Sequence, residues 1–271
     1  MDRLGIELLS VFGMPPVDFV KLAADLGCRY ISTGMTGFPL PQLGQAEFSL
    51  SDDPALRREI LAAMDDTGVS ISLGDGMLIL PGADIRDSAP NLDILAELRV
   101  PRVNSVSLDP DRERTFDQFA VLAQLAAERG METTIEPAPG TTVGDLTIGL
   151  QALKHVGQSG FRLLIDAMHL IRSGFGAADL AALEPGSIGY AQLSDTTLQP
   201  RMDNYMQEAT FERMVPGEGE LPLQAIVDAL PADIVISLEV PRLSLAEAGV
   251  SHFDRVRPCV QAARGLLDGS K

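Results

Sequence analysis

Residues 132–166 read ETTIEPAPGTTVGDLTIGLQALKHVGQSGFRLLID, and this stretch decides the fold. Residues 132–136 and 162–166 are short β-branched and aliphatic runs of the kind that form buried strands. Residues 143–156 between them predict a helix. A strand, a helix and a second strand in this order predict parallel strands joined by a right-handed crossover.

The same alternation continues on both sides of this stretch. We expect strands at 4–9, 30–33, 69–73, 103–108, 132–136, 162–166, 188–193 and 234–239. We expect helices at 16–26, 52–67, 85–98, 115–129, 143–156, 177–183, 223–230 and 253–267. Eight units in 271 residues average about 34 residues each, a comfortable length for a βα unit.

Eight alternating units favour an α/β protein with a single (β/α)8 TIM barrel over an open parallel sheet. A doubly wound open sheet is the alternative, but its first turn is usually rich in glycine. Residues 10–15, SVFGMP, do not fit the GxGxxG pattern. No linker interrupts the alternation, so we expect one domain over residues 1–271.

Charge and composition exclude several classes of function. Lys and Arg total 21 against 38 Asp and Glu, a net charge of −17, and no basic run is present to bind nucleic acid or an anionic membrane. No apolar stretch is long enough to span a membrane. The start, MDRLGIELLS, does not resemble a signal peptide, and two distant cysteines suit a reduced compartment. We therefore expect a cytoplasmic protein.

Four neighbouring strands each end in an oxygen donor. Glu136, Asp166 and Glu239 end the fifth, sixth and eighth strands, and Gln192 lies near the end of the seventh. Chemistry in such barrels takes place at this end of the strands. Three converging carboxylates would repel each other unless a cation binds them, and an oxygen-rich set suits Mg²⁺ or Mn²⁺. The four residues thus predict a divalent metal site.

Simpler explanations exist for single residues of this set and its neighbours. An acid at a strand end is often a loop or cap residue, and the Gln192 amide could bond a neighbouring loop. His169 could be structural or could reach the substrate. Glu7 could point into the barrel mouth, and Asp75 could be a substrate contact or a turn residue.

The longest irregular stretch is residues 194–222, and loops of that length are usually functional or mobile. We expect residues 199–205 to close over the barrel mouth. Arg201 and Tyr205 are then candidates for specificity contacts, with solvated loop residues as the alternative. The chain has no Trp and three Tyr, so few aromatic side chains are available to stack on a sugar.

Five short pieces give the chain a recognisable pattern. In order they are IEP at 135–137, DAMH at 166–169, QLSD at 192–195, RMVPGEG at 213–219 and LE at 238–239. With these pieces the chain resembles the xylose isomerase-like TIM-barrel superfamily, the group of sugar phosphate isomerases and epimerases. Many members carry His where this chain has Gln192, while the hydroxypyruvate isomerase and some dehydratase branches carry Gln.

The resemblance implies roles for individual residues. It implies a divalent metal, Mn²⁺ or Mg²⁺, held by Glu136, Asp166, Gln192 and Glu239, with the two glutamates also acting as acid and base. It implies that His169 and Arg213 bind substrate, and we assign Asp195 to the same group. The substrate-binding prediction therefore comprises His169, Arg213, Arg201, Asp195 and Tyr205.

The predicted activity is that of a metal-dependent isomerase or epimerase. It would act on a small hydroxy ketone, a sugar or a keto acid, through an enediolate intermediate. The alternative is a metal-dependent dehydratase of the inosose or 3-dehydroshikimate type, and a non-catalytic binding barrel is a third reading. The DNA-repair branch, endonuclease IV, needs more metal-binding histidines than the three present. We expect a small-molecule substrate and no nucleic acid or membrane partner. A homodimer is compatible with the sequence.

Overall fold

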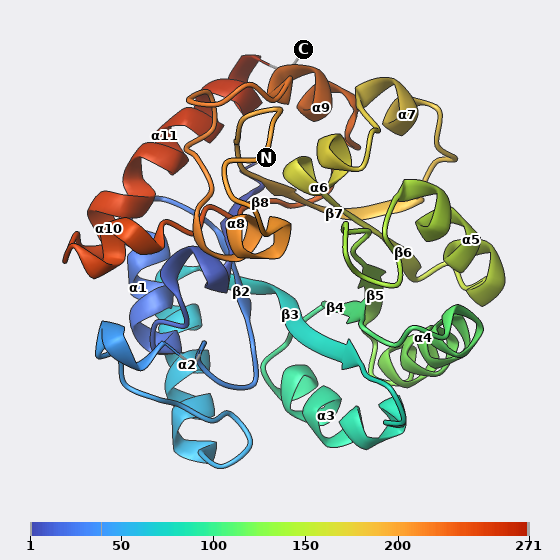
Figure 1. The fold of residues 1–271 in the computed structure, drawn as a ribbon. Coiled ribbons are helices and arrows are strands. Elements are labelled where there is room, and N and C mark those ends of the chain that lie inside the picture. The colour runs from blue at the N-terminus through green and yellow to red at the C-terminus, as the bar shows by residue number, and fades with distance from the viewer. Residues whose placement is uncertain (1, 39, 270–271) are drawn as a thin grey trace.

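The strands of the protein close into a parallel barrel. In this computed structural model the described residues are 2–38 and 40–269, so residues 1, 39, 270 and 271 of the expected domain lie outside them. Each strand pairs with the next, and β1 pairs with β8 (Figure 1). The strands are β1 (Leu4–Ile6), β2 (Tyr30–Thr33), β3 (Ser70–Ile79), β4 (Arg102–Ser107), β5 (Glu132–Ile135), β6 (Phe161–Asp166), β7 (Ile188–Leu193) and β8 (Ile236–Leu238). The predicted (β/α)8 TIM barrel is confirmed.

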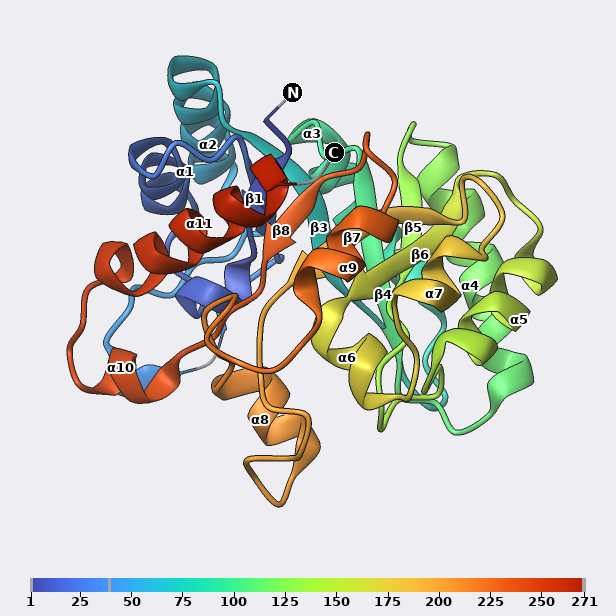
Figure 2. The same ribbon diagram turned by 90° about the horizontal axis from the view of Figure 1, so that it is seen from above.

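Helices surround the barrel, as Figures 1 and 2 show from two directions. In the described ranges they are α1 (Pro16–Asp25), α2 (Pro54–Thr67), α3 (Ala89–Glu97), α4 (Arg112–Ala127), α5 (Leu146–Val156), α6 (Ala167–Arg172), α7 (Ala177–Ala181), α8 (Tyr205–Phe211), α9 (Leu223–Ala229), α10 (Leu243–Glu247) and α11 (His252–Gly269). Short 3₁₀ helices are η1 (Leu8–Val11), η2 (Pro41–Leu43) and η3 (Ile85–Ser88). None of these helices is both long and apolar enough to cross a membrane.

Local sequence signals explain where the outer helices begin and end. α2 begins where the Asp53 side chain accepts a hydrogen bond from the Leu56 amide, and Pro54 occupies its first turn. It ends at Gly68, whose φ of 74° is the left-handed conformation that glycine adopts at low cost. Asp145 and Gly157 bound α5 in the same way.

The expectation of eight helices was too low. α6, α8 and α10 have six, seven and five residues, too few to show an amphipathic repeat in the sequence. α6 begins directly at the end of β6 because the Asp166 side chain accepts from the His169 amide at 2.8 Å. α8 lies inside the stretch 194–222 that we expected to be irregular. β3 also continues to Ile79, six residues beyond its expected end.

The barrel interior is polar toward the ends of the strands. The Tyr190 hydroxyl on β7 donates to Glu7 Oε1 at 2.8 Å and lies 3.0 Å from Ser72 Oγ, so it joins β7 to β1 and β3. Leu73 and Leu164 pack against the same ring. This buried layer lies beneath the mouth, where the polar strand ends gather.

Candidate metal and substrate site

Three carboxylates converge at the mouth of the barrel. Asp166 is the last residue of β6, and Glu136 and Glu239 are the first residues after β5 and β8. One ligand atom from each lies within 4.8 Å of those of the other two. The register brings them together, because Asp166 pairs with Gln192 across β6 and β7, and Leu193 pairs with Leu238 across β7 and β8. All three carboxylates are almost fully buried.

Arg213 lies between two of these carboxylates. Its Nη1 lies 2.5 Å from Asp166 Oδ2, and its Nη2 lies 2.8 Å from Glu239 Oε2. Burial disfavours the charged form of Asp166, but Arg213 and His169 outweigh that effect, so the pKa of Asp166 falls below its usual value. Burial dominates at Glu239, with Glu136 adding to it and Arg213 opposing it, and raises the pKa of Glu239 well above its usual range.

His169 contacts the other side of the cluster. Its Nε2 lies 3.3 Å from Glu136 Oε1, and its Nδ1 lies 2.5 Å from the Tyr205 hydroxyl. Tyr205 is the first residue of α8, and His169 lies on α6, so these contacts join α8 to α6 and to the carboxylate that follows β5. The structure therefore brings both His169 and Tyr205 to the mouth, while their predicted contacts with substrate remain predictions.

Gln192 supplies the observation that bears on a cation. Its Nε2 donates to Glu239 Oε1 at 3.2 Å, while its Oε1 is buried and has no hydrogen-bond partner. A buried acceptor without a partner requires a water, an ion or another explanation. Three carboxylates and an orphaned amide oxygen form the donor set that a hard divalent cation prefers. The residues present thus fit a divalent metal, and its identity stays open.

Asn104 on β4 is a polar neighbour that the sequence reasoning missed. Its Nδ2 donates to Glu136 Oε2 at 3.1 Å and to Asp75 Oδ1 at 3.3 Å, and its Oδ1 accepts from the Thr134 hydroxyl. Asp75 is half-buried, and its desolvation together with the nearby Glu136 raises its pKa to about 6. In the sequence, Asn104 is a single amide side chain within an otherwise buried strand. That pattern does not indicate which residue the amide contacts.

Two of the predicted substrate-binding residues lie elsewhere. The Asp195 carboxylate accepts from the backbone amides of Thr196, Gly217, Gly219 and Leu221, so it holds the 215–221 loop in place. The Arg201 guanidinium points to the Glu212 carbonyl oxygen at 3.4 Å. Neither residue lines the cavity at the carboxylates.

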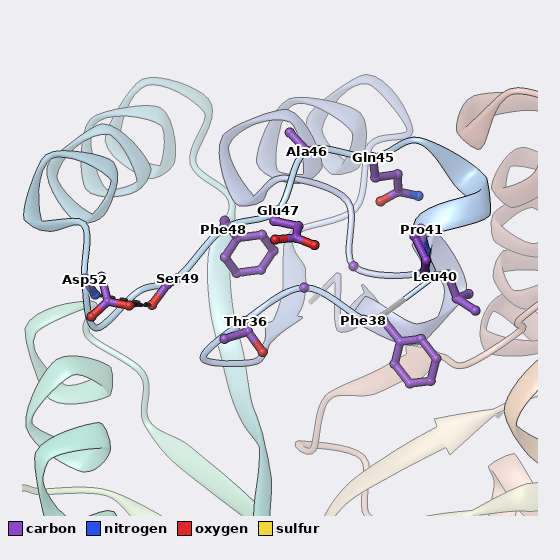
Figure 3. Close-up of a pocket in the computed structure, with 12 residues that line it drawn as sticks. Thr36, Phe38, Leu40, Pro41, Gln45, Ala46, Glu47, Phe48, Ser49 and Asp52 are labelled. Carbon is purple, nitrogen blue, oxygen red and sulfur yellow. Dashed lines mark hydrogen bonds between the residues drawn. The ribbon is translucent and has the colours of Figure 1, made fainter.

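That cavity has a volume of about 140 Å³, which suits a small ligand. Val106, Ala138, Met206 and Leu9 of η1 are apolar residues that line it, together with Thr141. A larger pocket of about 610 Å³ lies nearby, under the loop that follows β2 (Figure 3). Glu136, His169, Arg213 and Glu239 line the small cavity.

Comparisons with known proteins agree with this architecture. The family model for xylose isomerase-like TIM barrels matches residues 20–256. The IolI protein, whose crystal structure has a bound zinc atom, aligns with a TM-score of 0.78 at 17% identity over 99% of both chains. A D-psicose 3-epimerase from Clostridium cellulolyticum, solved with D-tagatose, aligns with a TM-score of 0.71 at 15% identity over 98% of this chain and 99% of its own.

A third similar structure is named as a dehydratase and not as an isomerase or epimerase. The probable 3-DHS dehydratase AsbF from Bacillus anthracis aligns with a TM-score of 0.73 at 15% identity over 97% of this chain and 98% of its own. No curated protein sequence matched significantly. At these identities the solved structures show a shared fold, so the reaction must be argued from the residues of this chain.

Proposed function

The chain belongs to the xylose isomerase-like TIM barrel family, and from this premise we propose that it is a divalent-metal-dependent isomerase or epimerase of a small hydroxy ketone. The observation that carries the proposal is the cluster of Glu136, Asp166 and Glu239, two of which, Glu136 and Glu239, line a cavity of about 140 Å³. Mn²⁺ and Mg²⁺ are the ions we expect. A cation bound there would stabilise the negative charge that develops on substrate oxygens during enolisation.

The two glutamates are the groups that we assign to proton transfer. Glu136 and Glu239 both line the cavity, and they follow β5 and β8. One removes the proton from the carbon next to the substrate carbonyl, and the resulting enediolate takes a proton back on the other face or on the neighbouring carbon.

Substrate orientation falls to the residues around the carboxylates. Arg213 offers a buried planar donor at the cavity wall, and His169 lines the same cavity. The Tyr205 hydroxyl fixes the His169 ring through Nδ1, so Nε2 faces Glu136 and the cavity. These contacts also cover the cavity from the side of α8.

Dehydration of an acidic or cyclic polyol ketone is the second candidate. The observation that favours it is Arg213, because a guanidinium at the cavity wall suits a substrate carboxylate. The same proton abstraction would then be followed by loss of a β-hydroxyl group as water. Isomerisation conserves the mass of the substrate, whereas dehydration lowers it by one water.

The test combines metal content with hydrogen exchange. We would measure metal in protein purified without chelator, then incubate it with ketoses, keto acids and cyclic polyol ketones in deuterated water. Glu136→Gln and Glu239→Gln should abolish deuterium uptake at the α-carbon, while Glu59→Gln on the outer face of α2 should not. No bound metal even after Mn²⁺ is added, and no exchange with any substrate, would leave a non-catalytic binding barrel.

A further inference from the structure

Met206, on α8, lies between the small cavity at the carboxylates and a wider groove beside it. Its side chain lines the small cavity. The groove has a volume of about 560 Å³, and Leu108, Gly140 and Thr141 are among the residues that line it. Thr141 lines both spaces. A Cβ atom on Gly140 would lie 3.7 Å from Met206 Cγ, so the methionine packs on a residue that lines the groove.

α8 turns one face toward the small cavity. Met206, Ala209 and Thr210 are three and four residues apart on this helix, and all three line the cavity. Ala209 is buried, whereas 42% of the Met206 surface is exposed. Figure 2 shows α8 projecting from the barrel, apart from the longer helices that surround it. Met206 therefore forms the outer edge of this wall, where the cavity meets the groove.

The backbone of α8 is held from another side of the helix. The buried Glu208 carboxylate pairs with Arg172 Nη2 at 3.0 Å and accepts from the Thr196 hydroxyl at 2.6 Å. It also accepts from the Arg201 backbone amide at 2.9 Å. These contacts do not involve the Met206 side chain. A substitution at position 206 can thus change the wall of the cavity while the helix keeps its place.

The volume of the small cavity limits the ligand that fits behind Met206. A water molecule occupies about 30 Å³ in the liquid, so the cavity of about 140 Å³ equals about five waters in volume. That space suits a ketose of three or four carbons, whereas a ketose of six carbons has twice as many atoms as one of three. The remaining carbons of a longer chain would have to pass Met206 and enter the groove.

We propose that Met206 determines the length of the carbon chain that the site accepts, and that the substrate is a hydroxy ketone of three or four carbons. The inference rests on the proposed function, because it concerns the same cavity. The methionine side chain has no hydrogen-bond donor, so the hydroxyl groups of a longer chain would lose water against it without gaining a partner. A smaller side chain at position 206 would join the cavity to the groove.

The first test measures binding, which does not depend on turnover. Glycerate and gluconate have three and six carbons, and both present the same α-hydroxy acid group to a divalent metal. Calorimetry with Mn²⁺ equimolar to the protein gives their dissociation constants. The wild type should bind glycerate roughly tenfold or more tightly than gluconate. Met206→Ala should narrow this ratio at least about threefold, and Met206→Phe should widen it.

Two control variants keep the wall of the cavity. Met206→Leu replaces the side chain by one of similar volume and should retain the preference of the wild type. Leu198→Ala removes an exposed apolar side chain from the same 194–222 stretch, at a position that lines neither space. Its ratio should equal that of the wild type.

Deuterium exchange at the α-carbon then separates this proposal from the proposed function. The probes are dihydroxyacetone, erythrulose, xylulose and fructose, ketoses of three to six carbons. We expect the wild type to exchange the two shorter ketoses and Met206→Ala to extend exchange to the longer ones. Exchange with the same length preference in Met206→Ala would refute the role of Met206 and leave the proposed function in place.

The binding results decide the remaining cases. A ratio that shifts in Met206→Ala without any exchange would support the role of Met206 and remove the isomerase function. Gluconate bound by the wild type as tightly as glycerate would overturn the proposal. So would an unchanged ratio in Met206→Ala, or no binding of either acid to the wild type.

Discussion

The guanidinium of Arg213 lies 2.8 Å from the Glu239 carboxylate and also touches Asp166, so one side chain neutralises two of the candidate metal ligands. Arg213 follows α8, whereas its partners end β6 and β8. A segment outside the barrel thereby balances charge that the barrel strands create. The predictions below follow from this arrangement and from the polar groups next to it.

Replacing Arg213 by Met should destabilise the metal-free protein. The change leaves Asp166 and Glu239 buried without their cation, and breaking a buried pair in this way costs about 3–5 kcal/mol. The loss should be larger at pH 8 than at pH 5, because protonation relieves the repulsion at low pH. Chemical unfolding at the two pH values, with and without Mn²⁺, measures the effect, and Mn²⁺ should restore part of the loss.

The control for this prediction is Arg99→Met, which removes an exposed ion pair with Asp65. Exposed pairs contribute little, so that variant should unfold nearly as the wild type does and should gain nothing extra from Mn²⁺. If Arg213→Met were as stable as the wild type at pH 8 without metal, the carboxylates would not depend on this guanidinium.

Gln192→Leu should weaken metal binding and leave the fold intact. The change removes an Oε1 atom without a partner and one hydrogen bond, from Nε2 to Glu239 Oε1, so it costs little stability, while a metal would lose one oxygen ligand. We expect affinity for Mn²⁺ to fall at least about tenfold, measured by calorimetry. Gln192→His should retain binding, and Gln151→Leu on the exposed face of α5 is the matched control. Unchanged affinity in Gln192→Leu would exclude the amide as a ligand.

Asn104→Ala should disturb the site through Glu136. The variant removes the donor that lies between Glu136 and Asp75, so the two carboxylates face each other directly. Loss of such a supporting partner lowers metal affinity by roughly 10–100-fold. Asn91→Ala on α3 serves as the control in the same titration, and equal affinities for the two variants would show that Asn104 does not position Glu136.

Glu7→Gln should flatten the dependence of stability on pH. Burial raises the pKa of Glu7 to about 7 from an ordinary 4.5. The folded state therefore holds a proton that the unfolded state releases, and this contribution is complete below pH 4.5 and lost as the pH rises to 7. The loss is about 3 kcal/mol, which glutamine avoids.

Unfolding free energies of Glu7→Gln at pH 4.5 and pH 8 measure this difference. The variant should match the wild type at the lower value and exceed it at the higher one. Glu59→Gln, on the exposed face of α2, should follow the wild type throughout. A Glu7→Gln curve parallel to that of the wild type would mean that Glu7 is ionised in the folded protein.

The sequence predicted the barrel well because strand patterns are local. Residues 30–33 and 188–193 form strands over the predicted ranges, since each is rich in aromatic, aliphatic or β-branched residues and is bounded by loop residues. The ends of β8 were placed too far out, because Ile234 and Val235 extend the apolar pattern before the hydrogen-bonded part and Glu239 follows directly after it. The short helices α6, α8 and α10 depend on caps and on contacts with the mouth, which periodicity does not report.

For the candidate site too, the sequence predicts some features and not others. The position of Glu136, Asp166, Gln192 and Glu239 at strand ends follows from the fold, so the sequence could predict that these residues lie together. The partners of Arg213, Asn104 and Asp195 depend on side-chain directions across loops, which a single sequence does not specify. The roles of all these residues in binding and catalysis stay predictions until the variants are measured.

The placement of Tyr205 and Arg213 at either end of α8 has a kinetic consequence. If α8 lifts, the phenol leaves His169 and the guanidinium leaves both carboxylates in the same movement. Ion exchange and product departure then require the same open state. We therefore expect the residence time of the ion and that of the product to share one rate, the rate at which α8 detaches from the barrel.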